Sequence, residues 1–296
     1  SVNDNCIDFY IKPGLVGKSA SIDYHPKTSF IKLKNESITI QDSVQKRLKI
    51  DRDWVLNKNN FNAYGEIIDT SDVDTLYRNI YDPSTFTGVV FKESLEKYGA
   101  RVKTISKKKT SNKSYKKISN HLSKPLIHSA TNLMNESDNL TAELFVKSIG
   151  ALDTLPGTWR VGLDSIKSFL AKEVLIDTSN IRLADASGVS RYNLTSAAQL
   201  NSLLKWMYNS LYKDDFISTL PGGGWKNSTL EKRLINEGDL VRAKTGGLSG
   251  VRNLAGYIQS KKYGDVAFSI LMNGYTDHSS RYARVHDQIV KSIIYD

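Results

Sequence analysis

Apolar and polar residues alternate in several short segments in the first third of the chain. Because alternation places every second side chain on one face, such segments are typical of half-buried strands, and three of them stand out: 7–11, 19–24 and 37–40. Between residues 84 and 99 the apolar spacing changes to that of a helix, and Gly99 is placed to end it. Residues 1 to about 105 are therefore expected to be mostly β-structure with one helix packed on it.

From residue 122 onward the apolar spacing is mainly helical. Ser123 is placed to cap a first helix with Pro125 in its first turn, and a second helix is expected to end at Gly150. The polar residues 135–139 between them predict a tight bend. Further helices are predicted to begin near residues 155, 195–196, 229 and 279, the last with Val285, Ile289, Val290 and Ile293 on its apolar face.

Three strands are predicted near the end of the sequence, over 240–244, 253–259 and 265–273. Together with the helices, they predict an α+β fold in which an antiparallel sheet is covered by helices. A lysine- and serine-rich segment over 106–120 separates this part from the β-rich part. We therefore expect one domain over 1–120, which includes this basic connector, and a second over 121–296.

The composition is that of a soluble globular protein, with 40% hydrophobic and 24% charged residues. No apolar run approaches the ~20 residues that span a bilayer, so no transmembrane segment is predicted. Much of the net charge of +10 lies in 103–117, but only Tyr115 is interleaved there, which argues against a nucleic-acid groove. A module that binds an anionic polymer through 103–117 is a weaker alternative.

Cysteine, histidine and the first residues add further expectations. Cys6 is the only cysteine, so no disulfide can form within the chain. The five histidines lack metal-like spacing, so no metal site is predicted and surface or capping roles are expected for them. Residues 1–5 contain neither a basic nor an apolar segment, so no signal peptide is expected in the chain: either it is cytoplasmic or a targeting segment has been removed.

Residues 241–251 combine a strand pattern with groups that suit a peptide ligand. Lys244 and Thr245 point to opposite faces of such a strand, and Gly246 leaves the backbone open to close approach. A cation, a hydroxyl and free amides in a row predict a site for an extended peptide that ends in a carboxylate. The Ser-Asp-Asn triplet at 137–139 lies in the bend between two helices, where its side chains can reach a cleft.

The triplets Ser-Asp-Asn and Lys-Thr-Gly, in this order and on these element types, belong to the signature of class A β-lactamases and penicillin-binding proteins. The chain resembles the low-molecular-mass class C penicillin-binding proteins, the D-alanyl-D-alanine carboxypeptidase/endopeptidase family. The resemblance is carried by the stretches 136–140, 156–160, 185–193, 216–221 and 243–257. It is dense over 122–296 and looser over 1–120, where it rests on Asn5-Cys6 and 91–99.

The family resemblance implies both a fold and an activity. The implied fold is a β-lactamase/transpeptidase-like antiparallel sheet covered by helices, together with part of a β-rich inserted domain. The implied protein is a periplasmic or exported serine-type D-Ala-D-Ala carboxypeptidase or endopeptidase, a hydrolase that acts on peptidoglycan stem peptides and binds β-lactams. No cofactor and no metal are implied.

The roles that the resemblance implies fall on both triplets. Lys244 would supply positive charge beside the nucleophile and the substrate carboxylate, which Thr245 would also bind. The Gly247 amide would belong to the oxyanion hole, and Ser137 would relay a proton to the leaving amine. Asn139 would hold a substrate amide. The catalytic set is thus Ser137, Asn139 and Lys244, and the substrate-binding set is Thr245, Gly246, Gly247, Ser249 and Arg191.

The family's nucleophile is the serine of a Ser-x-x-Lys helix in a Pro-Ala-Ser context, and that context does not occur in the sequence. Loose Ser-x-x-Lys matches begin at Ser29, Ser43, Ser94, Ser106, Ser114, Ser202 and Ser210, and none is assigned the role. We therefore expect a C-terminal portion that begins inside the inserted domain, with the missing N-terminal segment as a partner that covers the helices after Leu122. The alternative is a non-catalytic remnant that binds cell-wall peptides or a partner protein.

Overall fold

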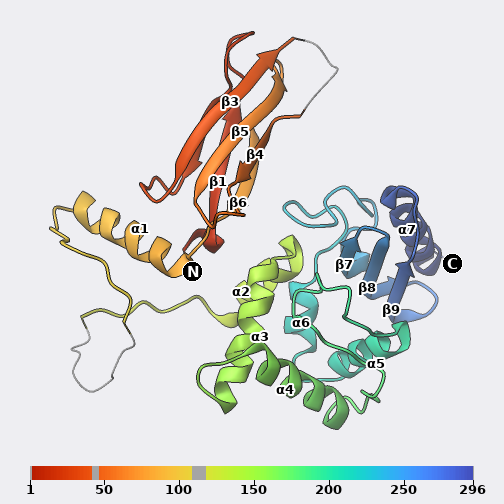
Figure 1. Ribbon diagram of the computed structural model, residues 1–296. Helices are drawn as coiled ribbons and strands as arrows, with labels where there is room; N and C mark the ends of the chain where they lie inside the picture. The colour runs from red at the N-terminus through yellow and green to blue at the C-terminus, as the bar shows by residue number, and fades with distance from the viewer. Residues whose placement is uncertain (1, 42–46, 109–117, 296) are drawn as a thin grey trace. The chain divides into compact units, whose positions relative to one another are not determined.

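The structure is a computed structural model that describes residues 2–41, 47–108 and 118–295 (Figure 1). The chain forms two compact units, residues 1–118 and 119–296. The division between them falls inside the lysine- and serine-rich segment over 106–120, of which residues 109–117 lie outside the described residues. None of the described helices is both long enough and apolar enough to cross a bilayer.

The described residues of the first unit form two small sheets, one α-helix and a short 3-10 helix. One sheet has the order β2-β1-β6 and is antiparallel, and the other has the order β3-β5-β4, in which β3 and β5 run parallel. The elements are η1 Asn3–Asn5, β1 Cys6–Lys12, β2 Ser21–His25, β3 Lys32–Ile40, β4 Lys49–Arg52, β5 Asn60–Ile68, β6 Asp74–Asn79 and α1 Pro83–Lys97. The three predicted strands are confirmed in β1, β2 and β3, and β4 to β6 lie beyond what the alternation predicts.

Aromatic side chains from strands and helix fill the core of the first unit. Phe9 and Phe61 are fully buried with ring centroids 5.1 Å apart, and Phe86 of α1 belongs to the same buried cluster. The carboxylate of Asp82 caps the first turn of α1, and Gly99 follows the helix with a φ of +87°, a conformation that suits glycine. The predicted helix with a glycine after its end is confirmed.

The second unit is a three-stranded antiparallel sheet of order β7-β8-β9 with helices on both faces (Figure 1). Its elements are α2 Leu126–Glu136, α3 Asn139–Asp153, α4 Trp159–Lys172, α5 Ala197–Tyr208, α6 Lys213–Thr219, η2 Gly238–Leu240, β7 Val241–Leu248, β8 Val251–Ser260, β9 Gly264–Asn273 and α7 Ser279–Tyr295. Leu254 and Ile258 of β8 are buried with Val290 of α7, whereas Tyr257 packs with Leu204 of α5 on the opposite face. The predicted α+β fold is confirmed.

Two predicted helix ends are wrong. Pro125, rather than Ser123, precedes α2, and no side chain caps that helix. α3 continues past Gly150 to Asp153. Gly150 lies inside the helix, where its hydrogen faces the start of α4. A Cβ atom at this position would lie 2.8 Å from the Thr158 carbonyl oxygen. This glycine allows close packing between helices instead of stopping one.

The helix predicted near 229–236 does not form. These residues make successive turns, and Leu234 has a φ of +52°, outside the range of a right-handed helix. Leu230 and Leu234 are both buried in the cluster that includes Val241 of β7. In place of the predicted helix, turns insert two leucines of this segment into the core.

The buried face of α7 also differs from the prediction. Val285 and Ile289 are 40% and 36% exposed. The residues that α7 buries are Ala283, His286, Val290 and Ile294. The expected surface or capping role is therefore wrong for His286, which is fully buried because it lies one turn from Val290 on the sheet-facing side.

Candidate active site

The bend that carries Ser137 is held on both sides. α2 ends at Glu136, and Ser137, which follows it, has left-handed backbone angles of φ 62° and ψ 48°. Asp138 then caps α3 by accepting hydrogen bonds from two N–H groups of its first turn at 3.0 and 3.2 Å. On the other side, Asn135 Nδ2 donates to the carbonyl oxygen of Thr219 in α6 at 3.3 Å. The hydroxyl of Ser137 is thus placed by local backbone geometry rather than by a flexible loop.

β7 is an edge strand, and part of its outer edge is open. The N–H of Ala243 donates to the carbonyl oxygen of Pro221 at 3.0 Å, on the side away from β8. Backbone groups alternate in direction along a strand, so the N–H groups of Thr245 and Gly247 point to the same side. Gly247 is exposed. An extended peptide can pair with this edge, as in β-strand addition.

Lys244 joins the two triplets. Its Nζ donates to Ser137 Oγ at 2.8 Å and to the carbonyl oxygen of Thr245 at 3.0 Å. Burial lowers the pKa of Lys244 from its ordinary 10.5 to about 8, because the charged ammonium loses solvation. No described carboxylate forms an ion pair with it. Lys244 is therefore an unpaired cation whose proton can be exchanged near neutral pH.

A cleft of about 920 Å³ lies beside Lys244. It is lined by the loop over 188–195, by α5 and α6, and by the strands of the sheet. The residues from β7 and the turn after it are Lys244, Thr245, Gly246, Leu248, Ser249 and Gly250. The cleft thus has an apolar wall of leucines on the helix side and a polar strand edge on the other, which suits a peptide with a charged end.

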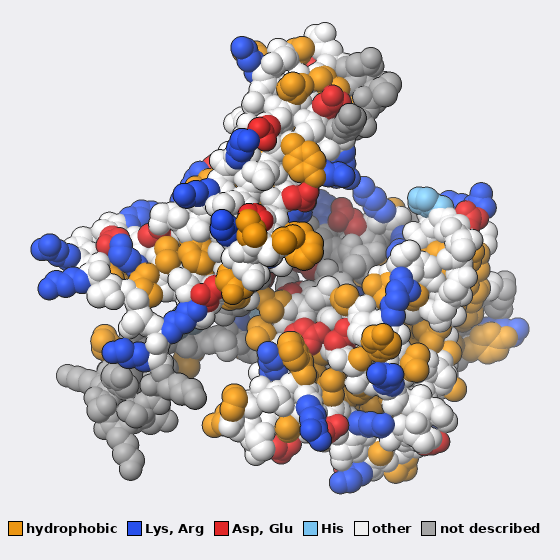
Figure 2. Space-filling view, viewed as in Figure 1, with side chains coloured by type: hydrophobic (Ala, Val, Ile, Leu, Met, Phe, Trp, Pro, Cys, Tyr) orange, Lys and Arg blue, Asp and Glu red, His pale blue; other side chains and the backbone are white. Residues whose placement is uncertain are grey.

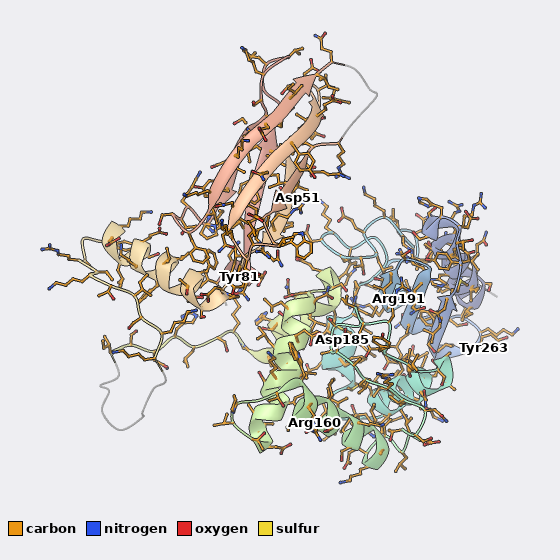
Figure 3. The ribbon with its side chains drawn as sticks, in the orientation of Figure 1. Asp51, Tyr81, Arg160, Asp185, Arg191 and Tyr263 are labelled. Atoms are coloured by element: carbon orange, nitrogen blue, oxygen red, sulfur yellow. The ribbon has the colours of Figure 1, made fainter. Side chains whose placement is uncertain are left out.

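The loop over 185–193 is folded around one carboxylate and tied to the strand turn. Asp185 accepts hydrogen bonds from the Gly188 N–H at 2.8 Å and from Asn193 Nδ2 at 2.6 Å. Arg191 Nη2 donates to the carbonyl oxygen of Ser249 at 2.6 Å. Figure 3 labels Asp185 and Arg191 on this loop, which connects α4 to α5 in the sequence. The loop therefore fixes Arg191 at the rim of the cleft.

A family model, the D-Ala-D-Ala carboxypeptidase 3 (S13) family, matches residues 1–292. The chain belongs to this family. The match includes the first unit, where the resemblance read from the residues was loose.

Two of the similar proteins are named as carboxypeptidases. The chain is 30% identical over 276 residues to a D-alanyl-D-alanine carboxypeptidase of Actinomadura sp. strain R39, covering 90% of this chain and 50% of the relative. It is 27% identical over 310 residues to penicillin-sensitive carboxypeptidase A of Dictyostelium discoideum, covering 98% of this chain and 58% of the relative. The chain thus spans about half the length of these two relatives.

A solved structure has the same fold. Penicillin-binding protein 4 of Haemophilus influenzae, in a complex with a β-lactam, superimposes with a TM-score of 0.78 at 22% identity. The match covers 99% of this chain and 70% of that chain. At this identity the likeness concerns the fold, and it supports the helix-covered antiparallel sheet described above.

The residues assigned by the family resemblance do not all meet in the cleft. Its lining contains five of them: Lys244, Thr245, Gly246, Ser249 and Arg191. Ser137 joins them through its hydrogen bond with Lys244, and Gly247 lies exposed on the open edge. Asn139 is exposed at the first position of α3 and makes no side-chain hydrogen bond with a described residue.

Glu143 is part of the site's framework that sequence reasoning missed. Its carboxylate accepts hydrogen bonds from the N–H groups of Ala186 and Ser187, the latter at 2.9 Å, and so anchors the loop to α3. No spacing rule connects positions 43 or 44 residues apart, so the sequence offers no signal for this contact. The bond exists only because α3 passes beneath the loop.

Two of the loose Ser-x-x-Lys matches lie in the second unit, and neither reaches the cleft. Ser202, Lys205 and Ser210 line a separate pocket with Trp206 and Tyr212. Ser202 Oγ donates to the carbonyl oxygen of Ala198, within its own helix. Lys213 lies over the ring of Tyr208 instead. Within the described part of this unit, no such pair lies beside Lys244.

Proposed function

We propose that the protein is a serine-type D-Ala-D-Ala carboxypeptidase/endopeptidase that acts on peptidoglycan stem peptides, in a periplasmic or exported location. The observation that carries this proposal is the 2.8 Å hydrogen bond between Lys244 Nζ and Ser137 Oγ, at a strand edge that is open to a peptide. The names of the relatives, which are D-alanyl-D-alanine and penicillin-sensitive carboxypeptidases, support the same reaction class.

The substrate would lie along β7 as an added strand. The carbonyl carbon before the terminal D-alanine is attacked by a serine hydroxyl, and the resulting oxyanion accepts a hydrogen bond from the Gly247 N–H. The proton lost by that serine reaches the leaving amine through Ser137, which Lys244 holds in place. Water then hydrolyses the acyl ester, so the peptide acid is released and the serine is regenerated.

Two further assigned residues would contact the peptide. Asn139 would hold a substrate amide from the start of α3. Arg191, fixed at the rim by Ser249, would contact the stem-peptide side chain. The nucleophilic serine itself stays unassigned. A β-lactam would be bound in the same orientation and would acylate the same serine.

The test uses the full-length protein and an N-acylated peptide that ends in D-Ala-D-Ala. We expect stoichiometric release of free D-alanine, together with covalent labelling by a fluorescent penicillin. Ser137→Ala should slow D-alanine release about 10²- to 10⁴-fold, because the proton relay is lost. Ser218→Ala, which removes an exposed hydroxyl of α6, is the matched control. Specific peptide binding with neither labelling nor release would favour a non-catalytic binding protein instead.

The alternative of an anionic-polymer module has less support. On the face that Figure 2 shows, Lys and Arg side chains are interspersed with acidic and apolar side chains rather than gathered in one patch. Residues 109–117, which hold much of the basic run, lie outside the described residues, so this alternative stays a prediction. Retention on an anionic column that does not change with salt would contradict it.

A further inference from the structure

A second cation lies beside the strand edge that the proposed function uses. Arg252 of β8 is the direct cross-strand partner of Gly247. A Cβ atom on Gly247 would lie 3.1 Å from Arg252 Nη1, so the guanidinium occupies the space that a side chain at residue 247 would need. Because alternate residues of β8 face opposite sides, Arg252 shares its face with Leu254 and Ile258, the α7 side of the sheet.

Among the described residues, this arginine has no ion-pair partner for its charge. No described residue accepts a hydrogen bond from its guanidinium, and its Nε is buried without any partner. The nearby carboxylate of Asp287 is already bound by Arg233, with an Nη2–Oδ1 distance of 2.7 Å. An arginine side chain stays protonated when it is half-buried, so the cost of desolvating it is not relieved by loss of the proton.

Two unpaired cations therefore lie on the two faces of one short strand segment. Lys244 approaches from the cleft side, where it contacts Ser137, and Arg252 approaches from the α7 side. Between them, the N–H groups of Thr245 and Gly247 point outward from the open edge. An anionic group placed at this edge would meet a cation on each side and free amide donors in the middle. A carboxylate matches the planar fork of an arginine.

We propose that Arg252 is a specificity-determining residue that binds the free α-carboxylate of the D-amino acid leaving the substrate. This inference rests on the proposed function. The amine of that residue leaves next to Ser137 and Lys244, so its carboxylate, two bonds farther along, falls at Thr245 on the side from which Arg252 reaches. Gly247 contributes by having no side chain, which leaves the guanidinium its place.

The test compares two substrates that differ only in the terminal group. One is an N-acylated peptide ending in D-Ala-D-Ala with a free carboxylate, and the other is the same peptide as the carboxamide. With the full-length protein, kcat/KM should be clearly higher for the acid. Arg252→Gln should lower kcat/KM for the acid about 10- to 100-fold, mainly through KM, and leave the amide within about threefold. Arg252→Lys should recover part of the preference.

The control is Arg284→Gln, which removes the same charge from an exposed position on α7. It should leave unchanged the ratio of kcat/KM for the acid to kcat/KM for the amide. A change in this ratio would reveal a long-range effect of net charge. If Arg252→Gln lowers kcat/KM equally for both substrates, or leaves kcat/KM for both unchanged, Arg252 has a structural role and the inference is overturned. If the unmodified protein releases neither D-alanine nor D-alaninamide, the proposed function itself fails.

Discussion

The two units differ in what they bury. The buried positions of the first unit, among its described residues, are apolar apart from Thr28, Ser37 and Thr39. The hydroxyls of Ser37 and Thr39 accept backbone hydrogen bonds at 3.1 and 2.9 Å. Most of its charged side chains stay at the surface, where Lys92 pairs with Glu96 at 2.7 Å, although Arg52 Nε and Glu93 Oε2 are buried without a hydrogen-bond partner among the described residues. This unit has the pattern of a part that is stabilised by packing.

The second unit buries groups that packing alone does not favour. Lys244 is half-buried beside an open edge without an acidic partner, Arg252 is unpaired, and His286 is fully buried with both ring nitrogens unpartnered. Isolated buried charges lower stability, so their presence indicates a use other than holding the fold. The contrast is one of degree, and it supports the proposal of a site in the second unit independently of the Ser-Asp-Asn and Lys-Thr-Gly triplets.

The largest effect is expected for Lys244→Met, which keeps most of the side-chain volume and removes the charge. We expect kcat/KM for D-alanine release to fall about 10³-fold or more, because both the proton exchange and the charge beside Ser137 are lost. The free energy of unfolding should stay equal or rise, since an unpaired half-buried cation is removed. Release assays and urea unfolding on the same preparation measure both.

Lys205→Met is the matched control, because Lys205 is exposed on α5 and outside the cleft. It should change neither quantity appreciably. A Lys244→Met variant that keeps activity within tenfold, or that unfolds far more easily, would show that Lys244 belongs to the framework and not to the chemistry.

The elements that carry the two triplets could be predicted from the sequence, because both elements depend on short-range patterns. The alternation at 241–244 and the polar bend at 135–139 are local features, and the structure has them as β7 and the α2–α3 junction. Whether a charge has a partner is not local. Arg252 and Asp287 are 35 positions apart, and only the packing of α7 on β8 decides which cation Asp287 binds.

The same reason explains the errors at Gly150 and at 229–236. A glycine at the end of an apolar run favours a helix stop, yet here it serves a close approach to Thr158. Leu230 and Leu234 have helical spacing, yet turns bring both into the core. In both cases tertiary contacts override a correct local preference.

A second prediction addresses the packing of the first unit. Phe61→Ala should lower the free energy of unfolding of this unit by about 3 kcal/mol or more, because the ring is fully buried against Phe9 and its removal leaves a cavity. Urea unfolding followed by hydrogen exchange at β5 amides measures it. Phe91→Ala, at a position that is 63% exposed, should lower the free energy of unfolding far less. Equal losses in the two variants would contradict the core described for this unit.

The smallest expected effect concerns His286 and appears only in acid. Burial lowers the pKa of His286 to about 4, from an ordinary 6.5, with further lowering by Arg233 and Arg252 and an opposing contribution from Asp287. Between pH 6.5 and 4 the unfolded chain therefore binds a proton that the folded chain does not. Unfolding is favoured as the pH falls through this range, with a slope of up to about 1.4 kcal/mol per pH unit from this group.

His286→Leu should remove that slope, because leucine fills a similar space and does not titrate. Urea unfolding at pH 7.5, 6 and 5 measures the free energy of unfolding. Relative to the unmodified protein, this free energy should increase for the variant as the pH decreases. His121→Leu, which replaces an exposed histidine, should leave the pH profile unchanged. Parallel profiles for His286→Leu and the unmodified protein would mean that His286 takes up its proton in the folded state over the same pH range as in the unfolded chain. A charged His286 near Arg233 and Arg252 would in turn require an anion in addition to Asp287, and the contrast between the units would then rest on Lys244 and Arg252 alone.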